Sequence, residues 1–348
     1  MENQTTDEFF MRRCLQLASL GAGTVAPNPM VGAVVVCNGL IIGEGYHHKC
    51  GGPHAEVNAI ASVRNQELLA QSTIYVSLEP CSHFGKTPPC ADLIISKHIP
   101  EVVVGMIDPF GKVNGNGIRK LREAGCNVRV GVLEQECRNL NRAFITYHLK
   151  KRPYIILKWA ESADGYIDAM RTVANKPVWL TNDACRTLVH KWRAESGAIM
   201  VGYNTALLDN PQLNVRAWNG RNPLRIVTDR CLQLPDNLAL FDHSQPTWRL
   251  NDSVDSHSDN LDTISLPWNT DMLPTLMLKL YDAGINQLIV EGGTKLLQSF
   301  IDTGLWDEAR VFTGTINLYD GVAAPSIDGV VDCENLIGDI RLTIRLNQ

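Results

Sequence analysis

The chain has 348 residues, which is more than one typical hydrophobic core accommodates and predicts two domains. Residues 1–150 carry 14 basic against 13 acidic residues, and residues 151–348 carry 18 against 24. Neither half has the basic excess on which nucleic-acid binding depends, and no apolar run reaches the roughly 18 residues of a membrane span. We therefore expect a small-molecule substrate, with no nucleic-acid or membrane partner.

The start of the chain, MENQTTDEFF, lacks the basic and apolar regions of a secretory signal. We therefore expect a cytoplasmic protein. In that compartment the ten cysteines would be thiols or metal ligands rather than disulfides.

Strand and helix signals alternate through the first 147 residues. Short β-branched runs bounded by turn residues predict strands at 31–37, 73–78, 101–106 and 127–132. Amphipathic stretches predict helices near 8–20, 54–64, 90–97, 115–124 and 133–147. This alternation predicts a three-layer α/β domain over residues 1–147.

A second α/β series follows a break in the pattern. Residues 148–153, HLKKRP, are charged and contain a proline, which predicts a linker before a domain over 154–348. Its predicted strands lie at 154–159, 197–202, 224–229, 286–290 and 308–313. Its predicted helices lie near 182–194, 271–284 and 294–303. Residues 242–270 are polar, and we expect a surface excursion that contributes little to the core.

A histidine, a glutamate and two cysteines form the strongest chemical signal. His54 and Glu56 stand at a predicted helix start in GGPHAEVNA, and Cys81 and Cys90 follow in LEPCSHFGKTPPC. One imidazole and two thiolates are the three protein ligands of a catalytic zinc site that leaves its fourth position to water. Glu56 is placed to move protons to and from that water, as in the H-x-E … P-C … C pattern of zinc deaminases. The alternative is that His54 caps the helix and the cysteines are buried thiols.

The first domain resembles the deaminase domain of the bifunctional riboflavin-biosynthesis deaminase/reductase family. The resemblance rests on TVAPNPMVGAVVV, GEGYH and the two motifs above. It also rests on the eight residues between Cys81 and Cys90, where cytidine and tRNA-adenosine deaminases typically have two. It implies a cytidine-deaminase-like fold and hydrolytic deamination of a diaminopyrimidinone that carries ribose 5-phosphate. The pocket residues it implies are Asn28, His47, Lys86 and Asp108.

Ordinary structural roles remain open for two of these residues, since Asn28 lies between two prolines and Lys86 lies in a polar loop. One departure from the family is visible. Where many members have Asp-Pro-Asn, this chain has Asp108-Pro109-Phe110.

The second domain resembles the NADPH-dependent reductase of the same family, which has a dihydrofolate-reductase-like α/β fold. The segments that carry this resemblance are YIILKWAESADGYI, VWLTND, HKWRAESGAIMVGYNTALLDNPQLNVR and LIVEGGTKLLQSFIDTG. The last is a strand, two glycines and a helix start, where backbone N–H groups bind a pyrophosphate well. A plain strand–turn–helix connection uses the same residues.

The resemblance implies roles for residues throughout this domain. Those expected to contact the cofactor are Glu161, Trp179, Thr205, Asp209, Gly293 and Thr294. Those expected to hold the substrate are Arg193, Leu213, Arg216 and Glu291, with the two arginines on its phosphate. Lys158, Asp209 and Glu291 would surround the sugar carbon that receives hydride. A solvated surface charge remains the alternative for each arginine, and a turn residue for Asp209.

Three departures bear on the reductase. The usual Ser-Leu-Asp-Gly is Ser162-Ala163-Asp164-Gly165, and a usual serine is replaced by Pro177 or Val178. Residues 314–327, GTINLYDGVAAPSI, resemble the family only loosely.

Together these observations predict a bifunctional, cytoplasmic zinc deaminase and NADPH-dependent reductase, and we expect it to be a homo-oligomer. The first alternative is a deaminase whose reductase-like domain is non-catalytic and serves oligomerisation. The others are a nucleic-acid deaminase, which the near-neutral first domain disfavours, and a structural zinc module, which would need a fourth protein ligand.

Overall fold

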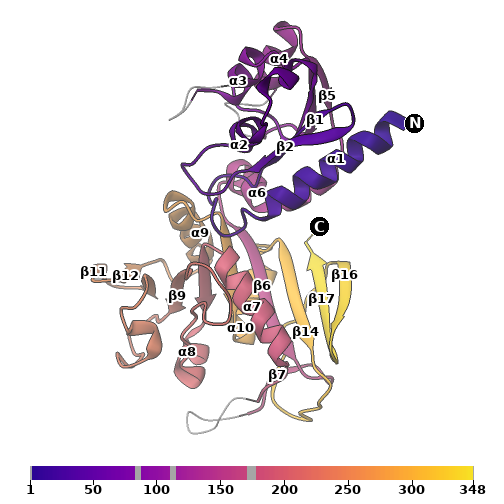
Figure 1. Ribbon diagram of the computed structural model, residues 1–348. Helices are drawn as coiled ribbons and strands as arrows, with labels where there is room; N and C mark the ends of the chain where they lie inside the picture. Colours follow the sequence, from indigo (N-terminus) through magenta and orange to yellow (C-terminus); the bar gives the residue numbers. More distant parts are fainter. Residues whose placement is uncertain (1, 83–87, 110–114, 171–177, 348) are drawn as a thin grey trace. The chain divides into compact units, whose positions relative to one another are not determined.

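A computed structural model describes residues 2–82, 88–109, 115–170 and 178–347 (Figure 1). The chain divides into two compact units, Met1–Lys151 and Arg152–Gln348. Lys86, Phe110 and Pro177 lie outside the described residues. Among the helices described, none is both long and apolar enough to cross a membrane.

The first unit is built on a five-stranded sheet in the order β2-β1-β3-β4-β5. Its strands are β1 (Gly32–Cys37), β2 (Leu40–Tyr46), β3 (Thr73–Leu78), β4 (Glu101–Met106) and β5 (Asn127–Val130). Strand β1 is antiparallel to β2 and β3, whereas β3, β4 and β5 are parallel. The carboxyl ends of these parallel strands therefore lie at one edge of the sheet.

Helices cover both faces of this sheet. The helices are α1 (Glu2–Ser19), α2 (Ala55–Ser62), α3 (Cys90–Ser96), α4 (Asn116–Glu123), α5 (Glu134–Leu140) and α6 (Arg142–Lys150), with a 3₁₀ turn at Gln66–Gln71. Helices α2, α3 and α4 pack on one face, and α1 and α5 pack on the other. Successive strand residues point to opposite faces, so Val102 and Val104 join the first cluster and Val103 the second. The predicted three-layer domain is confirmed.

The second unit contains a ten-stranded sheet in the order β11-β12-β10-β9-β8-β13-β6-β14-β17-β16. In this spatial order, β12, β10, β9, β8, β13, β6 and β14 are parallel to one another. The strands at the two edges, β11, β17 and β16, are antiparallel to their neighbours. The central strands are β8 (Ala198–Val201), β13 (Gln287–Glu291), β6 (Tyr154–Glu161) and β14 (Glu308–Thr313). The outer strands are β9 (Leu224–Thr228), β10 (Thr247–Asn251), β11 (Ser256–Ser258), β12 (Leu261–Ser265), β16 (Val330–Ile337) and β17 (Ile340–Leu346).

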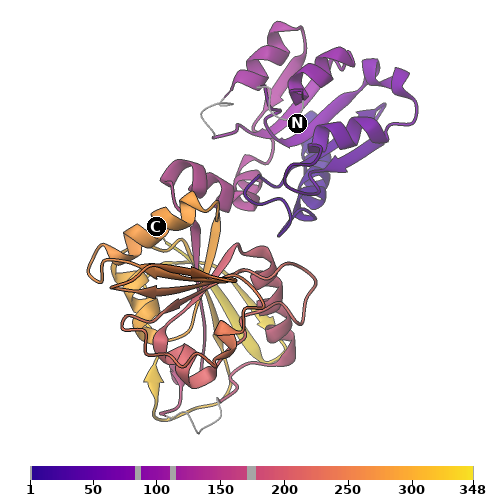
Figure 2. The ribbon, with the colours of Figure 1, turned by 90° about the vertical axis from the view of Figure 1, so that its left-hand side faces the viewer.

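Helices α9 (Met272–Asp282) and α10 (Thr294–Asp302) pack on one face of this sheet, and α7 (Asp183–Glu195) packs on the other (Figure 2). Trp192 of α7 stacks on Phe312 of β14, with ring centroids 5.5 Å apart. The remaining elements are α8 (Tyr203–Asp209), a 3₁₀ turn at Ala239–Phe241, and a small sheet of β7 (Tyr166–Asp168) and β15 (Val322–Ala323).

The prediction that residues 242–270 form a surface excursion is wrong for β10 and for the core residues beside it, although residues 252–260 are exposed. Strand β10 lies inside the large sheet between β9 and β12, and Leu250 and Leu266 belong to the core. Arg249 of β10 can be buried because it is paired with groups outside the segment. Arg249 donates to Asp229 Oδ2 at 2.7 Å and its guanidinium lies 4.7 Å from the centroid of the Phe241 ring. Polarity therefore does not indicate exposure here.

Candidate active sites

Three residues of the first unit form a metal-binding group. His54 precedes α2, Cys81 follows β3 after two residues, and Cys90 begins α3. Their ligand atoms lie within 4.8 Å of one another, with His54 Nδ1 3.6 Å from Cys81 Sγ and 3.4 Å from Cys90 Sγ. One nitrogen and two sulfur donors that converge in this way fit a zinc ion.

The surroundings favour an ionised Cys81 and a proton-carrying Glu56 carboxyl group. Hydrogen bonding by Cys90 and by His54 lowers the pKa of Cys81 to about 4, and the contact with Cys81, together with burial, raises the pKa of Cys90. The Cys90 N–H also donates to Cys81 Sγ at 3.3 Å. Burial raises the pKa of Glu56 to about 7. A carboxyl group with that pKa can both accept and release a proton near neutral pH.

Two of the predicted pocket residues lie beside this group. His47 Nδ1 donates to the Pro53 carbonyl at 3.0 Å, which leaves Nε2 as the acceptor for Asn28 Nδ2 at 3.1 Å. Burial lowers the pKa of His47, which favours the neutral ring. The His47 and His54 rings meet edge to face with centroids 5.5 Å apart. Asn28 and His47 are therefore held in fixed orientation next to a candidate metal ligand.

Asp108 follows the carboxyl end of β4 and is buried. Its N–H donates to the carboxylate of Glu79, a buried residue that the sequence analysis did not single out. A signal for Glu79 was present, because a charged residue that closes the apolar run TIYVSL is unusual unless it has internal partners.

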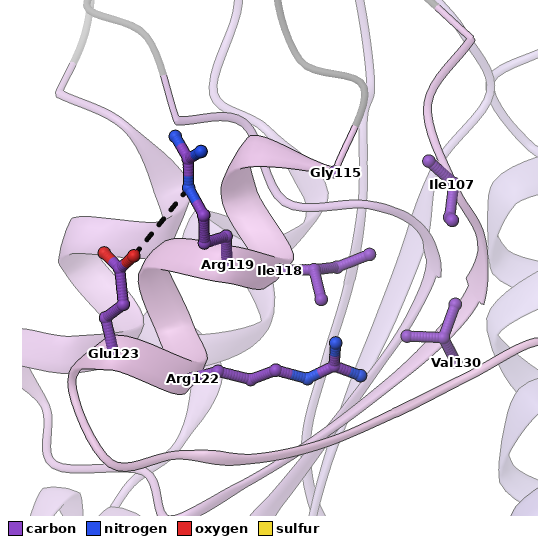
Figure 3. Close-up of a pocket in the computed structure, with 7 residues that line it drawn as sticks. All are labelled: Ile107, Gly115, Ile118, Arg119, Arg122, Glu123 and Val130. Carbon is purple, nitrogen blue, oxygen red and sulfur yellow. Dashed lines mark ion pairs between the residues drawn. The ribbon is translucent and has the colours of Figure 1, made fainter.

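A pocket of about 360 Å³ also lies in this unit (Figure 3). It is lined by Ile107, Gly115, Ile118, Arg119, Arg122, Glu123 and Val130. None of these lining residues belongs to the predicted deaminase site.

In the second unit, Lys158, Glu291 and Arg193 form a charged cluster. Lys158 and Glu291 are register partners on the adjacent strands β6 and β13. Arg193 of α7 binds the Glu291 carboxylate through two hydrogen bonds of 3.1 and 2.7 Å. Burial alone would raise the pKa of Glu291, but Arg193 and Lys158 lower it to about 2. Burial lowers the pKa of Lys158. Arg193 is thus engaged by Glu291 and does not stand as an isolated cation.

Further cationic groups lie beside this cluster. Burial, and then the charges of Arg193 and Arg186, lower the pKa of Arg216. The Arg216 N–H donates to His190 Nδ1 at 3.4 Å, and burial lowers the pKa of His190 to about 4. No sequence motif pointed to His190 or Arg186, although both stand at helical spacing from Arg193 and so on its face of α7. Arg193, Arg186 and Arg216 together form a positive environment that suits an anion, and His190, with its lowered pKa, lies beside them as a neutral ring.

Of the residues expected to bind the cofactor, Thr205 of α8 lies in contact with Gly293, directly before α10. The Gly293 N–H donates to Thr205 Oγ1 at 3.0 Å, and Thr294 begins α10. A Cβ on Gly292, which has φ +101°, would lie 2.6 Å from Thr205 Oγ1, so only glycine allows this approach. These helices follow the adjacent strands β8 and β13, and the start of α10 offers backbone N–H groups at that edge of the sheet.

The other predicted residues of this unit lie around its edge. Asp209 is exposed at the last position of α8, and Leu213 is buried nearby in sequence with φ +51°. Glu161, at the end of β6, accepts a hydrogen bond of 2.8 Å from Trp159 Nε1. The Trp179 side chain is 62% exposed, and the Arg186 guanidinium lies 4.8 Å from the centroid of its ring.

Two departures from the family pattern are accommodated by backbone contacts. Ala163 contributes its N–H to the Ile316 carbonyl at 2.8 Å, a bond that does not depend on its side chain. Asp164 accepts the N–H groups of Leu318 and Tyr319 at 3.1 and 2.8 Å. Residues 314–327 are therefore anchored to the turn after β6 despite their unusual sequence.

Comparison with known proteins agrees with both sites. Residues 4–106 match the cytidine and deoxycytidylate deaminase zinc-binding region, and residues 153–331 match the RibD C-terminal domain. The riboflavin biosynthesis protein RibD of Aquifex aeolicus is 39% identical over 91% of this chain and 89% of its own length. That of Actinobacillus pleuropneumoniae is 41% identical over 88% and 83%.

A solved structure of similar fold is a diaminohydroxyphosphoribosylaminopyrimidine deaminase/5-amino-6-(5-phosphoribosylamino)uracil reductase from Thermotoga maritima. It has 36% identity and a TM-score of 0.91, and the match covers 99% of this chain and 100% of that one. The fold and the sites thus define a zinc-binding deaminase joined to a reductase. The chain belongs to the RibD family of bifunctional enzymes of riboflavin biosynthesis. The family resemblance, the fold class, and the zinc and NADPH dependence predicted from the sequence are confirmed.

The metal site leads to a direct prediction. Freshly purified protein should contain one zinc per chain, and a Cys81→Ala/Cys90→Ala variant should contain almost none, because one imidazole alone binds zinc weakly. Metal analysis by mass spectrometry measures both, with Cys50→Ala as the control because Cys50 is exposed and outside the group. Full zinc content in the double variant would contradict the assignment of the ligands.

Proposed function

We propose that the first unit hydrolytically deaminates a diaminopyrimidinone that carries a ribosylamino 5′-phosphate. We propose further that the second unit then reduces the ribosyl group of the product to a ribityl chain with NADPH. The observation that carries the first step is the group of His54, Cys81 and Cys90 with the buried Glu56 beside it. The name of the Thermotoga maritima protein describes the same pair of reactions.

The two activities are assigned to residues 1–147 and 154–348, with 148–153 as the linker. We also propose a cytoplasmic homo-oligomer. Helix α6 continues to Lys150, so the segment without regular structure before β6 is Lys151–Pro153.

In the deaminase, His54, Cys81 and Cys90 hold the metal. A bound zinc lowers the pKa of a coordinated water to about 7. Glu56 accepts one proton of the attacking water and delivers it to the ring nitrogen. It then carries the water's second proton to the amino group, which leaves as ammonia. The raised pKa of Glu56 suits both transfers, because a group with a pKa near 7 gains and loses a proton with similar ease at neutral pH.

The substrate is oriented by groups around that carboxylate. His47 is neutral and its Nε2 is directed at Asn28, so the pair presents a fixed arrangement of polar atoms to the pyrimidine edge. We assign Asp108 and Lys86 to the same substrate, Lys86 on the grounds of the family resemblance alone.

In the reductase, bound NADPH would provide the hydride for the sugar carbon, and the reaction also needs one proton. Lys158 is a suitable donor because burial lowers its pKa and makes the proton easier to release. Glu291, held ionised by Arg193, stabilises the charged amine before the transfer. We assign Asp209 to the same reacting centre.

The remaining assignments concern binding. We assign Arg193, Leu213 and Arg216 to the substrate, with the arginines facing its phosphate. The cofactor is assigned to Glu161, Trp179, Thr205, Gly293 and Thr294, and also to Asp209.

Replacing Glu56 should separate chemistry from metal binding. Glu56→Gln keeps the shape of the side chain but cannot take up a proton, so deamination should fall by about 10²-fold or more. Zinc content should stay at the wild-type level, and NADPH-dependent reduction of the already deaminated intermediate should be unchanged. Deamination at near wild-type rate would show that the proton carrier is another group.

Replacing Asp209 and replacing Arg216 should change different kinetic constants of the reduction. Asp209→Asn should lower kcat for reduction, as expected when an interaction is used in the transition state. Arg216→Ala should mainly raise KM, because a phosphate contact binds the ground and transition states alike. A lost charge-assisted contact is worth roughly 1.5–3 kcal/mol, or about ten- to 150-fold.

Steady-state NADPH oxidation with the deaminated intermediate measures both effects. Arg221→Ala is the matched control, because Arg221 is an exposed arginine close to Arg216 in the chain. If Arg216→Ala behaved like this control, Arg216 would have no part in substrate binding.

A further inference from the structure

Glu79 is a buried carboxylate outside the set of residues assigned to the reaction. Its Oε2 accepts the N–H groups of Asp108 and Gly115 at 3.2 and 2.9 Å. Its Oε1 accepts those of Gly117 and Ile118 at 2.8 and 3.3 Å. The side chain is 4% exposed, and both of its oxygens are occupied by backbone donors.

This arrangement requires a carboxylate. Each oxygen faces two N–H donors, so an amide at this position would place its NH₂ group against donors rather than acceptors. Three of the four donors belong to the first turn of α4 or to its N-cap, Gly115, where the helix dipole also favours a negative charge. Charge-assisted hydrogen bonds of this kind are among the stronger ones in proteins.

The contacts of Glu79 join three segments of the deaminase unit. The Glu79 N–H donates to the Met106 carbonyl at 3.0 Å, at the end of β4. A Cβ on Gly117 would lie 2.0 Å from the Pro80 carbonyl oxygen, so α4 packs directly on the turn that leads to Cys81. The end of β4, the start of α4 and the turn after β3 are therefore held as one piece.

We propose that Glu79 is a positioning residue of the deaminase that acts through Asp108. By fixing the backbone N–H of Asp108, Glu79 fixes where that residue stands at the end of β4. This inference rests on the proposed role of Asp108 in binding the pyrimidine substrate. Glu79 itself has no contact with the substrate in this account, because its oxygens are occupied.

The metal ligands have supports of their own. The Cys81 carbonyl accepts the N–H of Ala91 at 3.1 Å, and Cys81 Sγ accepts the N–H of Cys90 at 3.3 Å. Loss of the Glu79 carboxylate should therefore disturb Asp108 more than it disturbs the zinc site. Substrate binding, rather than metal content, is the property that Glu79 controls.

The test is Glu79→Gln in the full-length, zinc-containing protein, with deamination measured at steady state. We expect KM for the pyrimidine to rise by about 10- to 100-fold, the usual effect of losing a supporting hydrogen-bond partner. The fall in kcat should be smaller, and zinc content should be unchanged. Glu123→Gln is the matched control, because Glu123 is on α4 with a side chain 70% exposed.

A double-mutant cycle tests whether Glu79 acts through Asp108. Combined with Asp108→Asn, the Glu79→Gln change should raise KM much less than it does alone, because the residue it positions has already lost its charge. A role in general stability would instead lower the active fraction, and so kcat, without changing KM. Wild-type KM in Glu79→Gln, or an equal effect in both backgrounds, would overturn the proposal.

Hydrogen exchange in the unmodified protein provides a test that does not depend on a folded variant. The amides of Gly117 and Ile118 should exchange slowly, because both are buried and bonded to Glu79. Exchange at the rate of exposed amides would overturn the proposal. A wild-type chain that failed to deaminate would contradict the proposed function instead, and the exchange measurement would still test the contacts of Glu79.

Discussion

A buried charge must be compensated, and this requirement shapes both units of the enzyme. In the deaminase unit, the Glu79 carboxylate is compensated by four backbone N–H groups. In the reductase unit, Glu291 is compensated by Arg193 and Lys158, which lower its pKa to about 2. Each compensation also fixes geometry, because the donors come from separate segments of the chain. Removing one partner would leave the other charge buried and unpaired, so a single substitution in either cluster should destabilise the fold.

Both units place their chemistry at the carboxyl edge of parallel strands. Cys81 and Asp108 follow β3 and β4, while Glu291 ends β13 and α8 follows β8. Parallel strands deliver successive loops and helix starts to the same edge, so residues far apart in sequence meet there. The deaminase unit uses this edge to gather metal ligands, and the reductase unit uses it to gather charged groups beside two helix starts.

The sequence predicted the parts of this account that depend on local pattern. The runs at 73–78 and 101–106 are strands with those bounds, and the spacing of His54, Cys81 and Cys90 pointed to the ligands that the fold brings together. The prediction from sequence was wrong where pairing between distant residues allows a polar segment to be buried. Strand β10 was predicted to be part of a surface excursion because it lies in a polar stretch. Its arginine, Arg249, is nevertheless buried, and the carboxylate that pairs with it belongs to Asp229, outside that stretch.

Glu79 is separated from its partners at the start of α4 by 36 to 39 residues of sequence. Arg193 is separated from Glu291 by 98 residues. No local sequence pattern reveals contacts over such distances.

The central claim is that one chain carries out two successive reactions on one pyrimidine. The direct measurement is product mass after the purified protein is incubated with the ribosylaminopyrimidine phosphate, with and without NADPH. Without NADPH, the account predicts a single product in which an amino group has been replaced by oxygen. With NADPH, it predicts that this product gains two hydrogens. Accumulation of the deaminated compound alone under both conditions would contradict the account, and would leave the second unit without a catalytic role.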